Sequence, residues 1–207
     1  MSTSLAVFRG ALIVFGPAHS IIHSGMPMTE LLLILLVASP AERTALASAA
    51  VAQVGVTRQY DPSYTQLHYP GGDVPIERGV CADVVVRAFR KIGLDLQVAV
   101  HEDMKRNFAA YPQLWGLRVP DANIDHRRVP NLMKFFERNG KALRLAAPYE
   151  PGDVVAWRLA NGLYHIGVVS NVRNSAGTDS MVVHNIGDGT QLEDVLRAFT
   201  IIGHYRW

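Results

Sequence analysis

The stretch RGVCADVVVRAF, residues 78–89, contains the only cysteine of the 207-residue chain. Its apolar residues recur at helical spacing and Gly93 follows, so the stretch predicts a helix that begins near Cys81. Backbone N–H groups and the positive end of the helix dipole favour a thiolate in such a first turn, which predicts a lowered pKa for Cys81. Free cysteine is also among the most commonly buried residue types, so Cys81 alone is explained as well by packing as by catalysis.

The sequence around this helix predicts an α+β domain, with helices in the first part and strands in the second. The other helical segments are residues 39–54, which open with the capping-box pattern SPAE, 102–110 and 129–139. The Pro- and Gly-rich residues 56–79 predict a loop with little regular structure. Short β-branched segments predict antiparallel strands over 153–157, 164–170, 181–186 and 199–207. The expected architecture is N-terminal helices packed on a C-terminal antiparallel sheet.

Two histidines lie inside predicted strands, where histidine is an unusual choice: His165 in YHIGVV and His184 in VVHNIG. If the two strands are neighbours, both imidazoles point into one site. A cysteine nucleophile needs a base that takes its proton and a further group that orients the base, and Cys81, His165 and His184 supply this set in chain order. The alternative is that each histidine is a hydrogen-bonded, half-buried residue without a catalytic role.

A cysteine at a helix start, a histidine in H-[IV]-G-[IV] and a polar residue on the next strand resemble the NlpC-type papain-like cysteine peptidases of bacteria. More specifically, YPGGDVP, GVCADVV, HEDM, NIDHRRVPNL, PGDVV and HIGVVS…VHNIG resemble the bacterial domain of unknown function family 1287, over about residues 45–207. The resemblance implies a papain-like (NlpC-type) fold with Cys81 as nucleophile, His165 as general base and His184 as the orienting residue. It also makes Tyr69, twelve residues before the cysteine, a candidate for the oxyanion region.

The chain departs from the family pattern next to the cysteine. That pattern usually reads Asp-Cys-Ser-Gly, whereas here Val80 precedes Cys81, and Ala82 and Asp83 follow it. Asp83 would either oppose thiolate formation by its charge or stabilise the helix as an acid in the first turn.

The segment DANIDHRRVPNL contains Arg127 and Arg128, a pair suited to a bidentate hold on a substrate carboxylate. The alternative is a salt-bridged loop that leads into the next helix. The remaining charged candidates are interpreted as structural: His101, Glu102 and Asp103 as helix caps, and Glu193 and Asp194 as surface or turn residues.

Composition excludes some classes of protein. The 20 basic and 18 acidic residues are well mixed, with a net charge of +2, so no basic stripe typical of a nucleic-acid-binding protein is present. No CxxC pair or zinc-finger spacing occurs. No metal or other cofactor is therefore expected, although Cys81, His165 and His184 together form an alternative zinc site.

The N-terminal part carries the apolar run LLLILLVA, residues 31–38, whose length suits a signal peptide and is too short to span a bilayer comfortably. Residues 1–40 are therefore interpreted as a signal peptide or hydrophobic N-terminal segment, and 41–207 as the hydrolase domain. A true start at Met26 or Met28 would make the preceding residues non-native, and a buried core helix is the alternative to export. Export predicts a periplasmic or cell-envelope protein, with this segment cleaved or retained as a membrane anchor.

Together these patterns predict a cell-envelope cysteine hydrolase that cleaves amide or peptide bonds in peptidoglycan stem peptides through a Cys81–His165–His184 triad. The glycan strand is not an expected substrate, because no paired-carboxylate site is evident. The alternative is a non-catalytic wall-binding domain of the same fold. Acyl transfer, as in circularly permuted relatives, is disfavoured because those relatives place the histidine before the cysteine.

Overall fold

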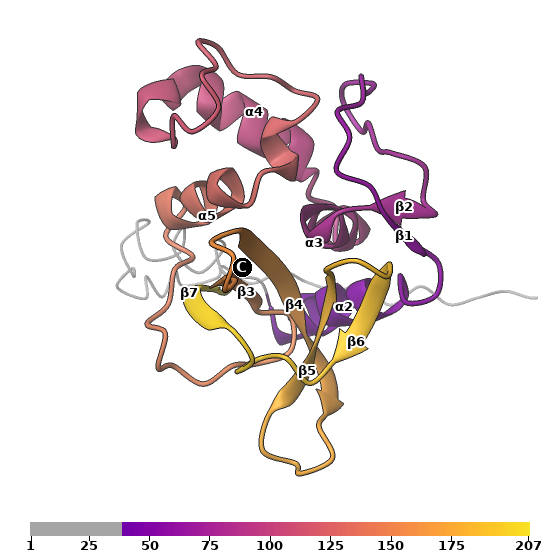
Figure 1. Ribbon diagram of the computed structural model, residues 1–207. Helices are drawn as coiled ribbons and strands as arrows, with labels where there is room; N and C mark the ends of the chain where they lie inside the picture. Colours follow the sequence, from indigo (N-terminus) through magenta and orange to yellow (C-terminus); the bar gives the residue numbers. More distant parts are fainter. Residues whose placement is uncertain (1–38) are drawn as a thin grey trace, which may run out of the picture. The chain divides into compact units, whose positions relative to one another are not determined.

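The computed structural model of the chain describes residues 39–207, which form four α-helices and a five-stranded antiparallel sheet (Figure 1). This arrangement confirms the predicted α+β class. The apolar run of the predicted signal peptide, residues 31–38, lies outside the described residues. Within residues 39–207, no helix combines the length and the apolar character that crossing a membrane requires.

Three of the helices follow the local sequence signals closely. The predicted capping box is present, since Ser39 Oγ accepts from the Glu42 N–H at 3.2 Å and Glu42 Oε2 accepts from the Ser39 N–H at 2.6 Å. The helices are α2 (Pro40–Val51), α3 (Cys81–Lys91), α4 (Leu96–Asn107) and α5 (Val129–Arg138), with short 3₁₀ turns η1 (Phe108–Ala110) and η2 (Asp125–Arg127).

The helix α4 is the exception, because it begins earlier than predicted. Its N-cap is Asp95, whose side chain accepts from the Gln97 N–H at 3.0 Å. His101, Glu102 and Asp103 therefore lie inside the helix, and their interpretation as caps is wrong.

The sheet has the strand order β6-β5-β4-β3-β7, so β4 lies at its centre. Four strands match predicted ones, whereas β6 has no predicted counterpart because its sequence, TQLE, is short and mostly polar. The segment expected to lack regular structure contains two-residue strands that pair in parallel. The strands are β1 (Gln59–Tyr60), β2 (Arg78–Gly79), β3 (Val154–Arg158), β4 (Tyr164–Arg173), β5 (Ser180–Asn185), β6 (Thr190–Glu193) and β7 (Thr200–Tyr205).

Each face of the sheet carries its own apolar cluster. The helix α3 packs on one face, together with Ile166 and Val168 of β4. The opposite face carries a smaller cluster around Trp157 of β3. Because side chains alternate along a strand and Trp157 is the register partner of His165, both His165 and His184 belong to the Trp157 face.

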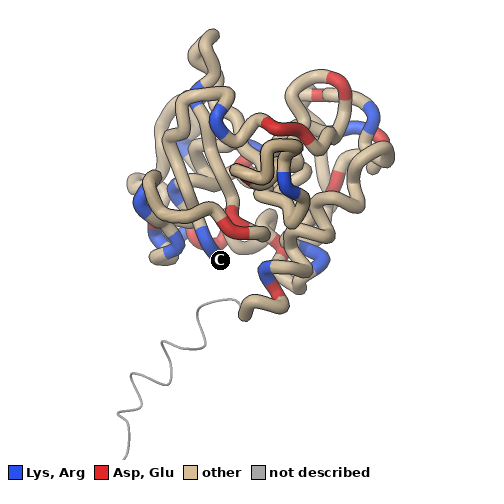
Figure 2. The backbone as a smooth tube through the Cα atoms, turned by 90° about the horizontal axis from the view of Figure 1, so that it is seen from below, with Lys and Arg blue, Asp and Glu red and all other residues tan. Residues whose placement is uncertain are grey.

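Acidic and basic residues are spread over the described fold (Figure 2), and some of them are buried in pairs. Asp153, just before β3, accepts from His204 Nε2 at 2.7 Å and from Arg206 Nε at 2.7 Å. Burial raises the pKa of Asp153, but the hydrogen bonds from Arg206 and His204 lower it below its ordinary value. These contacts hold His204 and Arg206 against the residue that precedes β3.

Candidate active site

Cys81 is the first residue of α3, and only 6% of its surface is exposed. Val80 before it is extended, with φ −114° and ψ 179°, so the chain turns into the helix at the cysteine. Burial raises the pKa of Cys81 to about 12, while the backbone N–H groups of Ile166, Ala82 and Cys81 itself act in the opposite direction. The lowered pKa predicted from the helix start is therefore wrong, because loss of hydration outweighs the helix dipole.

Asp83 anchors the start of this helix. Its Oδ2 accepts from the Val80 N–H at 2.7 Å, and Arg127 donates to the two carboxylate oxygens at 2.9 and 3.0 Å. Both alternatives for Asp83 hold, because it stabilises the first turn and its charge adds to the effect of burial in raising the pKa of Cys81. The thiol is consequently protonated at neutral pH.

Alkylation provides a direct test of this protonation state. The rate at which iodoacetamide modifies Cys81 is expected to rise about tenfold per pH unit from pH 7 to 9.5, because only the thiolate reacts and the thiol pKa lies above this range. The modified fraction is measured by mass spectrometry against time. Free cysteine serves as the control, with a plateau above its pKa of about 8.5. An alkylation rate of Cys81 that reached its plateau below about pH 8.5 would contradict the expectation.

The two strand histidines form a hydrogen-bonded pair. His165 Nε2 lies 2.9 Å from His184 Nδ1, and the rings meet edge to face with their planes at 83°. Trp157 stacks on His165, with 5.4 Å between ring centroids. Burial lowers the pKa of His165 to about 3, and the neighbouring His184 acts in the same direction. His165 is therefore neutral at neutral pH and has a lone pair with which to accept a proton.

Glu193 extends the pair by one residue. Its Oε2 lies 2.8 Å from His184 Nε2, close but not in line with a ring N–H, so the contact is electrostatic rather than a well-formed hydrogen bond. Burial lowers the pKa of His184, and the charge of Glu193 raises it. Glu193 favours the proton of His184 on Nε2. The Nδ1 of His184 then accepts from His165 Nε2, which leaves Nδ1 of His165 unprotonated.

Nothing in the sequence indicates this contact of Glu193, for which the pattern predicts a surface or turn position. The side chain is indeed 46% exposed. Its register partner Val182 lies on the same sheet face as His184, and this places the carboxylate beside the ring. Strand alternation along β6 is the sequence signal that could place Glu193 beside His184, and it can be used only after β6 has been recognised as a strand.

The thiol and the histidine pair make no hydrogen bond to each other within residues 39–207. The N–H of Ile166, the residue after His165, points to the Cys81 sulfur, whereas the ring of His165 turns to the other face of the sheet. Within residues 39–207, no hydrogen bond joins Cys81 to either histidine, and the partner of His165 is His184. The structure thus brings the two histidines together as predicted, but it does not bring His165 into hydrogen-bond contact with Cys81.

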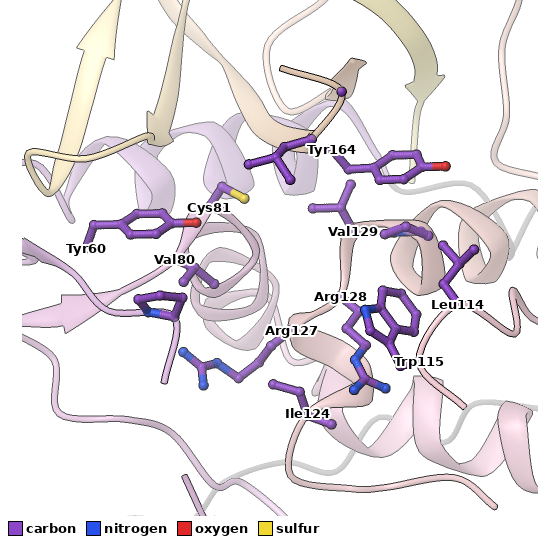
Figure 3. A pocket seen from close by; sticks show the side chains of 14 residues that line it. Tyr60, Val80, Cys81, Leu114, Trp115, Ile124, Arg127, Arg128, Val129 and Tyr164 are labelled. Atoms are coloured by element: carbon purple, nitrogen blue, oxygen red, sulfur yellow. The ribbon is translucent and has the colours of Figure 1, made fainter. Parts of the chain in front are cut away.

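A cavity of about 380 Å³ opens at Cys81 (Figure 3). Figure 3 shows the Tyr60 hydroxyl directed toward the cysteine, and burial, followed by the charge of Cys81, raises the pKa of Tyr60. Tyr69 does not line this cavity, since its hydroxyl donates to Glu102 at 3.2 Å. The assignment of Tyr69 to a site at Cys81 is therefore wrong, and the tyrosine that lines the cavity there is Tyr60.

The two arginines have different roles. Arg127 forms an ion pair with Asp83 and donates to the carbonyl oxygens of Asp61 and Ser63, at 3.3 and 3.2 Å. These contacts occupy its guanidinium, so the prediction that Arg127 binds a substrate carboxylate is wrong. Arg128 makes a single 3.4 Å contact with Asp125 and borders the cavity. Within the predicted pair, only Arg128 keeps donors for a ligand.

Cys81, His165 and His184 do not form a metal site. Among residues 39–207, no three or more His, Cys, Asp or Glu side chains are grouped to hold a metal ion. The alternative zinc site fails for a geometric reason, because the facing nitrogens of His165 and His184 bond to each other rather than to a common centre.

Fold and site together define an α+β domain with a buried cysteine at a helix start and a hydrogen-bonded histidine pair on the sheet. The chain belongs to the family described as Domain of unknown function (DUF1287), which matches residues 47–207. It is 50% identical over 210 residues to Uncharacterized protein YijF of Escherichia coli (strain K12), covering 100% of this chain and 98% of that protein. No solved structure matches the chain. The family indicated by the sequence motifs is thereby confirmed.

Proposed function

We propose that this protein is a cysteine hydrolase of the cell envelope, with a papain-like (NlpC-type) fold, that cleaves amide bonds in peptidoglycan stem peptides. The proposal rests on the 2.9 Å hydrogen bond by which His184 orients His165, and on a cysteine at a helix start that opens onto a cavity. A neutral histidine oriented by a second polar residue is the arrangement that a cysteine nucleophile requires.

The proposed reaction requires Nδ1 of His165 to come within reach of the thiol, with which it forms no hydrogen bond among residues 39–207. The Cys81 thiol then gives its proton to Nδ1 of His165 while the sulfur attacks the amide carbonyl carbon. Because thiol and imidazole are both neutral at rest, the proton moves together with the attack rather than before it. The Tyr60 hydroxyl and the N–H groups at the start of α3 stabilise the oxyanion. The C–N bond then breaks and the amine leaves with the proton from His165. Water hydrolyses the thioester and restores the thiol.

His184 and Glu193, which with His165 form a relay of three residues, stabilise the charge that appears on His165. His184 accepts from Nε2 of the imidazolium, and Glu193 compensates the positive charge from the far side of His184. Trp157 covers the pair and keeps water from competing for these contacts.

The cellular location rests on the N-terminal segment. The apolar run at residues 31–38 supports export, either with cleavage of the segment or with its retention as an anchor. Peptidoglycan is the abundant peptide polymer outside the bacterial cytoplasm, and this supports stem peptides as the substrate. Mass spectrometry of the N-terminus of protein recovered from the envelope fraction distinguishes cleavage from anchoring.

A second candidate function is a non-catalytic wall-binding domain. The observation that favours it is the resting state of Cys81, which is protonated and makes no hydrogen bond to either histidine within the described residues. In such a domain the cavity would bind a wall peptide without turnover.

Digestion of purified sacculi separates the two functions. Wild-type protein is expected to release peptide fragments that mass spectrometry detects, whereas Cys81→Ala protein of the same fold releases none. Binding of both proteins to sacculi without release of fragments supports the wall-binding domain instead. If neither digestion nor binding occurs while a small ester or isopeptide is turned over, the wall assignment fails and only the cysteine-hydrolase class survives.

Glu193→Gln tests the role of the outermost relay residue. Loss of the carboxylate charge is expected to lower kcat/KM about tenfold, because the imidazolium loses its compensating charge. Glu193 raises the pKa of His184, so its removal makes the relay less basic and moves the acid limb of the pH profile to lower pH. The matched control is Asp194→Asn, which removes a neighbouring charge that contacts Asn174 instead. A lowered rate with an unchanged pH profile would indicate a purely structural role.

A further inference from the structure

The cavity at Cys81 has an unbalanced charge. Among the described residues that line it, two are arginines and none is acidic. The charge of Arg127 is neutralised by the bidentate contact with Asp83, which itself lies outside the cavity lining. The positive charge that faces the cavity therefore belongs to Arg128.

Arg128 is held so that part of its guanidinium remains available. The group lies 4.2 Å from the ring centre of Trp115, and this contact fixes its plane. Its only hydrogen bond within residues 39–207 joins Nη1 to Asp125 at 3.4 Å, a long contact. Burial raises the pKa of Asp125 to about 6, so this carboxyl is a weak counter-charge in mildly acidic solution. The Nε and Nη2 donors can therefore serve a ligand carboxylate.

The rest of the cavity is mostly apolar. This lining suits an apolar side chain better than further peptide backbone, whose N–H and C=O groups would find few polar partners on the wall. A chain that ends there buries only an apolar side chain and a carboxylate. The apolar lining includes Leu114, Trp115, Ile124, Val129 and Leu163.

We propose that this cavity binds the carboxyl-terminal residue of a peptide, with its apolar side chain against the apolar wall and its free carboxylate on Arg128. The inference rests on the proposed hydrolase function and makes the enzyme exo-acting. Cys81 attacks the carbonyl carbon of the preceding residue, the amide C–N bond breaks, and the terminal residue leaves as a free amino acid that carries the proton from His165. Water then releases the shortened peptide from the sulfur as a carboxylic acid.

Binding is measured first, because it does not depend on turnover. Cys81→Ala protein is titrated by calorimetry with N-acetyl-alanyl-alanine, in all four stereoisomers, as free acids and as carboxamides. At least one free acid is expected to bind about tenfold or more tightly than its carboxamide. Arg128→Gln in the same background is expected to abolish the difference, whereas the exposed Arg118→Gln leaves it unchanged. Equal affinity of acid and carboxamide, or no binding of either, overturns the inference.

Turnover then distinguishes this inference from the proposed function. Wild-type protein acting on sacculi or soluble wall peptides is expected to release single free amino acids, with a KM that rises at least tenfold in Arg128→Gln while kcat changes less. Cleavage that depends on Cys81 but releases only internal fragments overturns the exo-acting inference and leaves the hydrolase proposal intact. Binding of the free acid without any cleavage supports the carboxylate site and overturns the hydrolase proposal.

Discussion

Cys81→Ala and His165→Ala are each expected to slow amide hydrolysis by about 1,000-fold or more, and the double variant is expected to be no slower than either single one. The two residues act in one step, because the sulfur attacks only as its proton passes to the imidazole. Removing either partner therefore removes the whole step. Initial rates of fragment release, measured with the three variants and wild type, provide the test.

The exposed residue His68 offers a matched control, because His68→Ala removes an imidazole outside the site and is expected to leave the rate within about twofold of wild type. Circular dichroism confirms that each variant is folded. Activity of His165→Ala close to that of wild type would show that another group accepts the thiol proton. Additive losses in the double variant would show that the two residues act independently.

Arg127→Ala is expected to reduce the free energy of unfolding by about 3–5 kcal/mol, because it leaves Asp83 buried without its counter-charge. The two side chains are 2% and 3% exposed, and their charged atoms meet at 2.9 Å. The variant also loses the bonds that tie the segment at Asp61 and Ser63 to η2. Urea denaturation followed by circular dichroism measures the change.

An exposed ion pair of α5 provides the comparison. Lys134→Ala breaks a 2.6 Å contact with Glu137 whose side chains are 34% and 41% exposed, and it is expected to cost less than about 1 kcal/mol. Equal losses for Lys134→Ala and Arg127→Ala would contradict the structural role of the buried pair. Asp83→Leu combined with Arg127→Met is expected to lose less than the sum of the single changes, since no unpaired charge remains.

Much of the fold was predictable because its signals are local. The capping box at Ser39 and Glu42 and the apolar spacing after Cys81 involve residues within one or two helical turns of each other. Strand alternation predicts that His165 and His184 point into one site if their strands are neighbours, and β4 and β5 are neighbours in the sheet. The weakest signals were those of β6, too short and polar to be recognised, and of the start of α4.

The sequence by itself determined the α+β class and the helix that carries Cys81, because periodicity and caps depend on near neighbours. Only the tertiary structure decided which groups meet the cysteine. Arg127 is 44 residues from Asp83 along the chain, and the path of the loop rather than any motif brings Tyr60 to the cavity in place of Tyr69. The pKa of Cys81 was decided in the same way, because its largest cause is burial by the packed fold, which outweighs the local effect of the helix start.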